Sequence, residues 1–267
     1  MGQFTRKGSA AVAAATAEQE TKVSAHVPFP SGTTLKVRIL SAEDSAEYYA
    51  HSIFGKVPTF VPKTPAERND RGFITGNPSL FDRAAELLYA DAKAAKDAGD
   101  ESKAEKLRNE AYLYKSKPRY LVGFGNLETG ELGFVDLTPK QAKGVFATIS
   151  KYAKKLDKLA FELSKTGSST NTAVTLSPIL DIDDEDELTK EQRANFDKLD
   201  GKSFDFGVFD GFLFEADEAE QATNLVKAGF DISRLGLTIG SGAVASDNIK
   251  PIDDDRPIDI SEDDLPF

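Results

Sequence analysis

Apolar and polar side chains alternate along the chain from Thr34 to Leu40. In an extended chain, this alternation places the aliphatic side chains on one face and two cations, Lys36 and Arg38, on the other. The pattern therefore predicts a half-buried strand with a basic outer face.

Further strands are expected where β-branched and aromatic residues cluster between turn-forming residues. They cover residues 119–124 and 131–137, which form a hairpin, and residues 172–180 and 204–214. The last stretch is interrupted at Asp210 and Gly211, so it is one strand or two.

The helical segments follow a different periodicity. Sequence rich in Ala, Leu and Lys predicts antiparallel helices over residues 79–98 and 101–114, with Asn77 and Pro78 as N-cap and first-turn residues. A short helix is also expected over residues 219–228.

A longer helix is expected from Pro139 to near Gly167. Thr138 and Gln141 match a capping box, in which each side chain bonds the backbone of the other. Apolar residues then recur at steps of three and four as far as Leu163, which is the period of one helix face.

Strands grouped around inserted helices, without regular alternation of strand and helix, indicate a mainly β fold with α insertions. The expected architecture is an antiparallel barrel like the oligonucleotide-binding (OB) fold, over residues 29–240, with a helical insertion at residues 78–115. Residues 1–28 are expected to form a flexible basic and Ala-rich arm. Residues 241–267 are polar and acidic, which predicts a disordered tail.

Charge is distributed unevenly along the chain of 267 residues, whose net charge is −11. Residues 1–180 hold 25 Lys and Arg against 20 Asp and Glu, whereas residues 181–267 hold 8 against 24. A basic body followed by an acidic end favours a phosphate-binding surface with a tail that competes for it. Simple solubility explains the same asymmetry, because many acidic proteins bind no nucleic acid.

Several classes of function find no support in the residues. The chain has no cysteine and two histidines, and it has neither a Walker A motif nor a nucleotide-binding glycine fingerprint. The acidic run from Asp181 resembles a calcium loop, but Asp186 and Gln192 stand where that loop needs Gly and Glu. We therefore expect no catalysis, metal or cofactor, and the lack of a long apolar run predicts a cytoplasmic protein that does not enter membranes.

Aromatic and cationic residues are interleaved between Tyr48 and Phe73. A protein that binds single strands without sequence preference needs cations along the phosphates and aromatic faces for the bases. The expected DNA-binding residues are Lys36, Arg38, Tyr48, Tyr49, His51, Phe54, Lys56, Phe60, Lys63, Arg68, Arg71, Lys115, Lys117, Arg119 and Tyr120. Each of these aromatic side chains is equally compatible with a place in the core, and each cation with a solvated face.

The acidic tail ends in apolar residues, which are unusual in a disordered segment. A terminal ring fills an apolar pocket while its own carboxylate and the neighbouring aspartates meet a basic rim. The expected partner-binding residues are Asp263, Asp264, Leu265, Pro266 and Phe267.

These last five residues resemble the acidic tip of bacterial single-stranded-DNA-binding proteins. The body is similar to the single-stranded-DNA-binding proteins of tailed bacteriophages over about residues 30–180. The similarity is carried by the basic start Phe4–Ser9, the strand Leu35–Leu40, the segment opening at His51, and Lys117–Val122.

The resemblance implies a protein that coats single-stranded DNA during replication, recombination or repair in the bacterial host cytoplasm. It implies that the tip recruits replication and recombination proteins, such as a polymerase, a helicase or its loader, or a recombinase. It also implies cooperative self-association through the N-terminal arm, in which Arg6 and Lys7 match. Some members hold zinc in the insertion, and this chain lacks the cysteines for it. The alternative is an acidic adaptor or DNA-mimic scaffold that binds basic proteins and not DNA.

Overall fold

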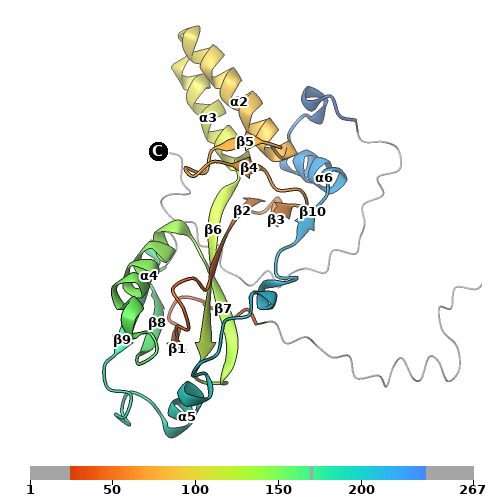
Figure 1. Cartoon of the computed structure of the whole chain (residues 1–267). Helices are drawn as coiled ribbons and strands as arrows, with labels where there is room; N and C mark the ends of the chain where they lie inside the picture. Colours follow the sequence, from red (N-terminus) through yellow and green to blue (C-terminus); the bar gives the residue numbers. More distant parts are fainter. Residues whose placement is uncertain (1–24, 169–170, 239–267) are drawn as a thin grey trace, which may run out of the picture.

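The computed structural model describes residues 25–168 and 171–238 (Figure 1). Most of the predicted arm and all of the predicted tail lie outside these residues, as do Arg6, Lys7 and the five residues of the tip. The described chain is mixed α/β. It combines β-strands with helices α2 to α6. No described helix combines the length and apolar character that crossing a membrane requires.

One large sheet organises the described residues. It contains β1 (Thr34–Arg38), β2 (Ser45–Ile53), β3 (Val57–Pro62), β6 (Lys117–Asn126), β7 (Glu131–Leu137), β8 (Ala160–Thr166), β9 (Ala173–Ile179) and β10 (Glu215–Ala216). Two short strands, β4 (Glu67–Arg68) and β5 (Ile74–Gly76), form a separate hairpin. The strands predicted at 34–40, 119–124, 131–137 and 172–180 are confirmed.

Strand β6 is the centre of the sheet. One edge pairs with β7 from Tyr120 to Asn126. The other edge pairs with β2 and, at Gly125 and Asn126, with β1. The order continues through β8 to β9 on one side and through β3 to β10 on the other. Within residues 25–168 and 171–238 the strands form no closed barrel, so the predicted closure is not found.

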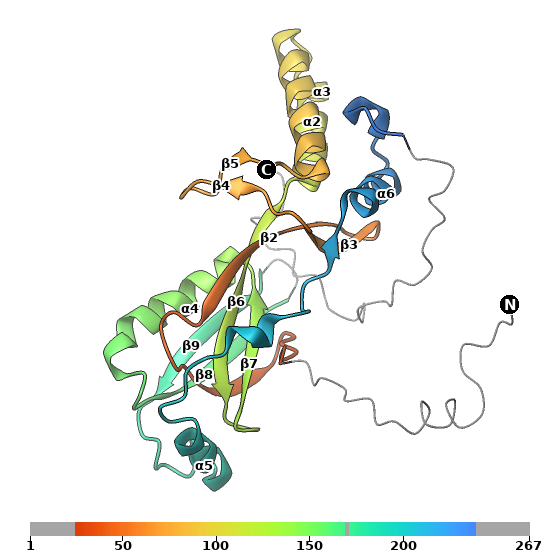
Figure 2. The same cartoon turned by 45° about the vertical axis from the view of Figure 1, so that its right-hand side comes forward.

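Two main apolar cores lie along this sheet. One is formed by β1 and β6 to β9 beneath α4 (Pro139–Tyr152). The other joins β2 and β3 to the helical hairpin of α2 (Leu80–Asp97) and α3 (Glu101–Tyr114), with α6 (Glu218–Ala228) beside it. A smaller cluster lies under α5 (Lys190–Lys198). Figures 1 and 2 show the helical hairpin projecting from one end of the sheet.

The predicted helical pair is confirmed, but its N-cap is not Asn77. Asn77 has a φ of 50°, and Ser79 caps α2 by accepting a hydrogen bond from the backbone of Asp82. The Asp82 carboxylate reaches back to the Ser79 backbone, so a capping box places the N-cap two residues later than predicted.

The long helix predicted to end near Gly167 stops at Tyr152. Its capping box of Thr138 and Gln141 is confirmed, but residues 160–166 form β8 between β1 and β9. Leu159, Phe161 and Leu163 are buried at alternate positions. Leu156, Leu159 and Leu163 satisfied a helical period over a short window, and pairing with two neighbouring strands decided the outcome.

The Phe-rich stretch predicted as strands forms a 3₁₀ helix, η3 (Phe206–Phe209), before β10. Phe204 packs over Gly123 of β6, at a distance that leaves no room for a Cβ. Phe209 and Phe212 meet the Phe134 ring edge-on. The aromatic residues are therefore used to cover β6 and β7, not to extend the sheet.

Candidate nucleic-acid interface

The predicted DNA-binding residues lie on opposite faces of the sheet. Tyr48 is paired with Arg119, and Tyr49 with Pro118, in the antiparallel register of β2 and β6. Because successive side chains of a strand point to opposite faces, Tyr48 and Arg119 share one face while Tyr49 and Tyr120 share the other. One continuous groove cannot contain all the predicted residues.

Three of them are buried. Arg38 is 3% exposed, with its guanidinium 4.0 Å from the Phe196 ring, and it donates to Asp200 at 2.5 Å. The predicted basic outer face of β1 is wrong for Arg38 because α5 covers it. His51 and Phe60 are each 1% exposed and stack in the core with centroids 5.3 Å apart. In this structure these three side chains do not reach a surface ligand.

Two further cations are held by carboxylates. Lys36 lies 2.6 Å from Glu162, and Arg119 donates to both oxygens of Asp136 at 3.0 Å. Burial lowers the pKa of Arg119, but Asp136 and Tyr48 outweigh burial, so the pKa is raised. Burial, with Asp136 beside it, also raises the pKa of Tyr48. A phosphate that bound Lys36 or Arg119 would have to break these ion pairs.

The other predicted residues differ in their surroundings. Lys117 lies over the Tyr112 ring at 4.8 Å. The exposed side chains are those of Phe54, Lys56, Lys63, Arg71 and Lys115. Phe54 and Lys56 are in the turn between β2 and β3, where Lys56 donates to the Ala228 carbonyl of α6.

The β4–β5 hairpin presents an aromatic ring and a cation to solvent. Phe73 is 64% exposed and Arg71 is exposed beside it. Their backbone amides both donate to the Asn69 side chain, at 3.0 Å from Arg71 and 3.1 Å from Phe73. The Asn69 amide donates to the Phe73 carbonyl at 3.0 Å. The turn that carries the exposed ring is therefore held by these hydrogen bonds at Asn69.

The same hairpin is attached to β2 through Arg68. The Arg68 guanidinium lies 3.7 Å from the centroid of the Tyr49 ring and donates to the Gly72 carbonyl at 2.8 Å. Gly72 has a φ of 77°, and a Cβ there would lie 2.5 Å from the Tyr49 hydroxyl. The turn can therefore approach Tyr49 only because residue 72 has no side chain.

Aromatic side chains continue from Tyr49 toward α4. The Tyr120 hydroxyl donates to Glu47 at 2.9 Å, and the Tyr120 ring meets Phe146 of α4 with centroids 5.6 Å apart. Burial and the Glu47 contact raise the pKa of Tyr120 to about 12. We call Phe73, Tyr49, Tyr120 and Phe146 the aromatic track.

Two shallow depressions lie at the α4 end of the track and share Ser150. The first, of about 270 Å³, is lined by Glu47, Tyr120, Phe146 and their neighbours. The second, of about 350 Å³, is lined by the end of α4 and three cations, Lys151, Lys154 and Lys155. The track thus has the hairpin arginines at one end and a lysine cluster at the other.

Sequence reasoning missed Phe146 and Glu47. Phe146 belongs to the apolar stripe of a helix, which indicates core, and the sequence carries no sign that this part of α4 borders an open sheet face. A solvated helix face fully explains the lysines after Ser150, so nothing in the sequence was a reason to select them. No cluster of three or more His, Cys, Asp or Glu side chains that suits a metal occurs in the described ranges.

Comparisons of this chain with protein-family models, with curated proteins and with solved structures found no match.

Proposed function

We propose that this chain binds and coats single-stranded DNA without sequence specificity, during DNA replication, recombination or repair. The observation that carries the proposal is the aromatic track, with cations at both ends and Phe73 64% exposed. We propose that β6, its hairpin partner β7 and the covering helix α4 belong to an open relative of the OB fold.

The track supplies the two interactions that such binding needs. Stacking of a base on an aromatic ring contributes about 1–3 kcal/mol and tolerates any base, because every base has a π face. We expect the exposed Arg71 and the lysines at 151, 154 and 155 to meet phosphates on either side of the stacked bases. Neutralising those phosphates releases counterions, which makes the affinity depend on salt.

The acidic end of the chain supports a second part of the proposal. Residues 263–267 are proposed to recruit replication and recombination proteins, and Arg6 and Lys7 to support cooperative binding. The last 27 residues, from 241 onward, contain eight acidic and two basic residues. We propose that this tail competes with DNA for the cations beside the aromatic track. We propose that the protein acts in the cytoplasm of a bacterial host.

Titration of a labelled unstructured oligonucleotide at several salt concentrations, with duplex of the same length as control, tests the DNA-binding part. The expected result is preference for the single strand and a linear fall of log affinity with log salt. Binding to neither DNA at any salt concentration would refute the proposal and favour an acidic adaptor that binds basic proteins.

Removal of residues 251–267 tests the tail. Single-strand affinity should rise or hold, while recruitment of partner proteins should be lost. A collapse of DNA binding would contradict the competitive role of the tail.

A further inference from the structure

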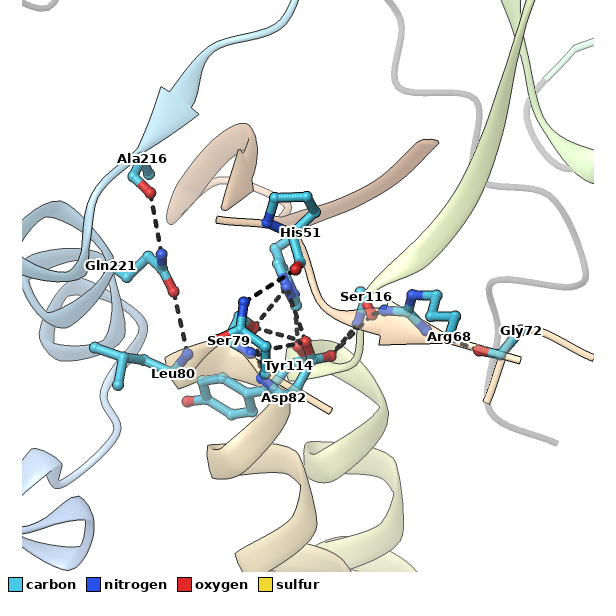
Figure 3. Close-up of polar contacts among 12 residues, drawn as sticks. His51, Arg68, Gly72, Ser79, Leu80, Asp82, Tyr114, Ser116, Ala216 and Gln221 are labelled. Atoms are coloured by element: carbon cyan, nitrogen blue, oxygen red, sulfur yellow. Dashed lines mark hydrogen bonds and ion pairs between the residues drawn. The ribbon is translucent and has the colours of Figure 1, made fainter. Parts of the chain in front are cut away.

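A buried polar network lies where the helical hairpin joins the sheet (Figure 3). It contains Ser79 and Asp82 at the start of α2, His51 of β2, and Ser116 between α3 and β6. Ser116 and Asp82 are each 4% exposed. In the described part of the chain, every buried side-chain nitrogen and oxygen has at least one hydrogen-bond partner.

The two carboxylate oxygens of Asp82 have different partners. Oδ2 accepts from the Ser79 hydroxyl at 2.7 Å and from the Ser79 amide at 3.3 Å, which completes the capping box. Oδ1 accepts from the Ser116 hydroxyl at 2.8 Å and the Ser116 amide at 3.4 Å. A capping box needs only one oxygen, so the bonds to Oδ1 serve another purpose.

Ser116 links the buried Asp82 to Arg68 through hydrogen bonds. A serine hydroxyl has one proton and two lone pairs. Because Ser116 gives its proton to Asp82, its oxygen presents lone pairs to Arg68, whose Nη2 donates to it at 2.6 Å. The other terminal nitrogen of Arg68 donates to the Gly72 carbonyl. Figure 3 shows this chain of contacts from Asp82 to Gly72.

We propose that Ser116 and Asp82 are positioning residues for the nucleic-acid interface. They hold the Arg68 guanidinium over the Tyr49 ring, and the guanidinium in turn fixes the turn that presents Arg71 and Phe73. Neither residue touches DNA. This inference rests on the proposed single-strand binding, because it assigns a role within that same interface.

The geometry explains why arginine is needed at position 68. A guanidinium offers donors in a rigid planar fork and also stacks on an aromatic face. Arg68 uses one terminal nitrogen for Ser116, the other for Gly72, and its plane for Tyr49. A lysine keeps the charge but cannot make all three contacts at once.

The test uses the full-length chain with Ser116→Ala, and Arg68→Lys as a second variant that changes only the surface end. Thr189→Ala is the control, because it removes a hydrogen-bonded hydroxyl at another site, the N-cap of α5. Amide hydrogen exchange of residues 67–76 and oligonucleotide affinity against salt are measured for each.

Ser116→Ala is expected to raise exchange across residues 67–76 and to weaken oligonucleotide binding on the order of 3- to 30-fold. The salt slope should become shallower by roughly one unit, because the hairpin cation no longer stays beside a phosphate. Thr189→Ala should change neither quantity. The effects of Ser116→Ala and Arg68→Lys should be strongly non-additive, because both break one chain of contacts.

Unchanged exchange of residues 67–76 in Ser116→Ala, or additive effects in the double variant, would overturn the inference. Failure of the wild-type chain to bind oligonucleotides would instead refute the proposed function. Hydrogen exchange would still report in that case whether Ser116 holds the hairpin.

Discussion

The guanidinium of Arg68 lies 3.7 Å from the centroid of the Tyr49 ring, which joins the β4–β5 hairpin to β2. A cation over an aromatic face contributes about 0.5–2 kcal/mol, depending on how far the pair is removed from water. Because the two residues are 19 positions apart, the contact fixes a surface turn to the main sheet.

The approach of Gly72 to Tyr49 gives the first prediction. Gly72→Ala should destabilise the chain by about 2 kcal/mol, because it combines a positive φ of 77° with a Cβ 2.5 Å from the Tyr49 hydroxyl. Tyr49→Phe in the same chain should recover the part due to the hydroxyl. Gly55→Ala is the control, since Gly55 has a φ of 68° and nothing within 4 Å. Urea unfolding of these three variants and the wild-type chain measures the losses, and equal losses at both glycines would contradict the predicted overlap.

The second prediction separates two exposed rings. Phe73→Ala should leave stability unchanged and weaken single-strand affinity by about 1–3 kcal/mol, because it removes a stacking surface. Phe54 is 73% exposed against 64% for Phe73, so Phe54→Ala removes a ring of similar exposure at the β2–β3 turn, outside the aromatic track. Fluorescence anisotropy with an oligonucleotide compares them, and equal effects would show that the track is not the binding surface.

The third prediction concerns pH. Burial lowers the pKa of His51 below its usual value of 6.5, although Asp82 and the Tyr114 carbonyl oppose burial and Arg68 adds to it. The folded state therefore prefers neutral His51, so its stabilising contribution is present above pH 6.5 and is lost as the pH falls through the folded-state pKa. The free energy of unfolding should decline more steeply below pH 6.5 in the wild-type chain than in His51→Gln.

The chain has only two histidines, which provides a direct control for that experiment. His26 stacks on Phe212 with centroids 4.8 Å apart. His26→Gln should keep the steeper decline of unfolding free energy below pH 6.5. If the steeper decline disappears in His26→Gln, the titration belongs to His26 and the prediction for His51 is wrong.

The fourth prediction compares how alanine substitutions at two glycines change the stability of the chain. Gly123→Ala should cost about 1–3 kcal/mol, because its Cβ would overlap the Phe204 ring above it. Phe204→Leu should recover part of that loss. Gly144 lies on the exposed face of α4 with its nearest neighbour at 3.6 Å, so Gly144→Ala should stabilise by about 0.5–1 kcal/mol through helix propensity. Thermal and urea unfolding measure both, and a neutral Gly123→Ala would show that the covering segment is displaced easily.

Local patterns predicted the elements whose signals are local. The capping box at Thr138, the paired helices around Gly99 and the hairpin of β6 and β7 all follow from residues a few positions apart. The same reasoning failed between Leu156 and Leu163, because a short apolar run fits both periods and strand pairing over more than 100 residues decided between them.

By itself, the sequence determined the alternation along β1, and therefore which residues of that strand share a face. It could not determine which face is covered, because burial depends on segments that are distant along the chain. Phe196 and Asp200 enclose Arg38, and Asp136 holds Arg119. Only the tertiary structure decided that Tyr49, Tyr120 and Phe146 form one track, since side-chain contacts across strands and helices arise when the chain packs.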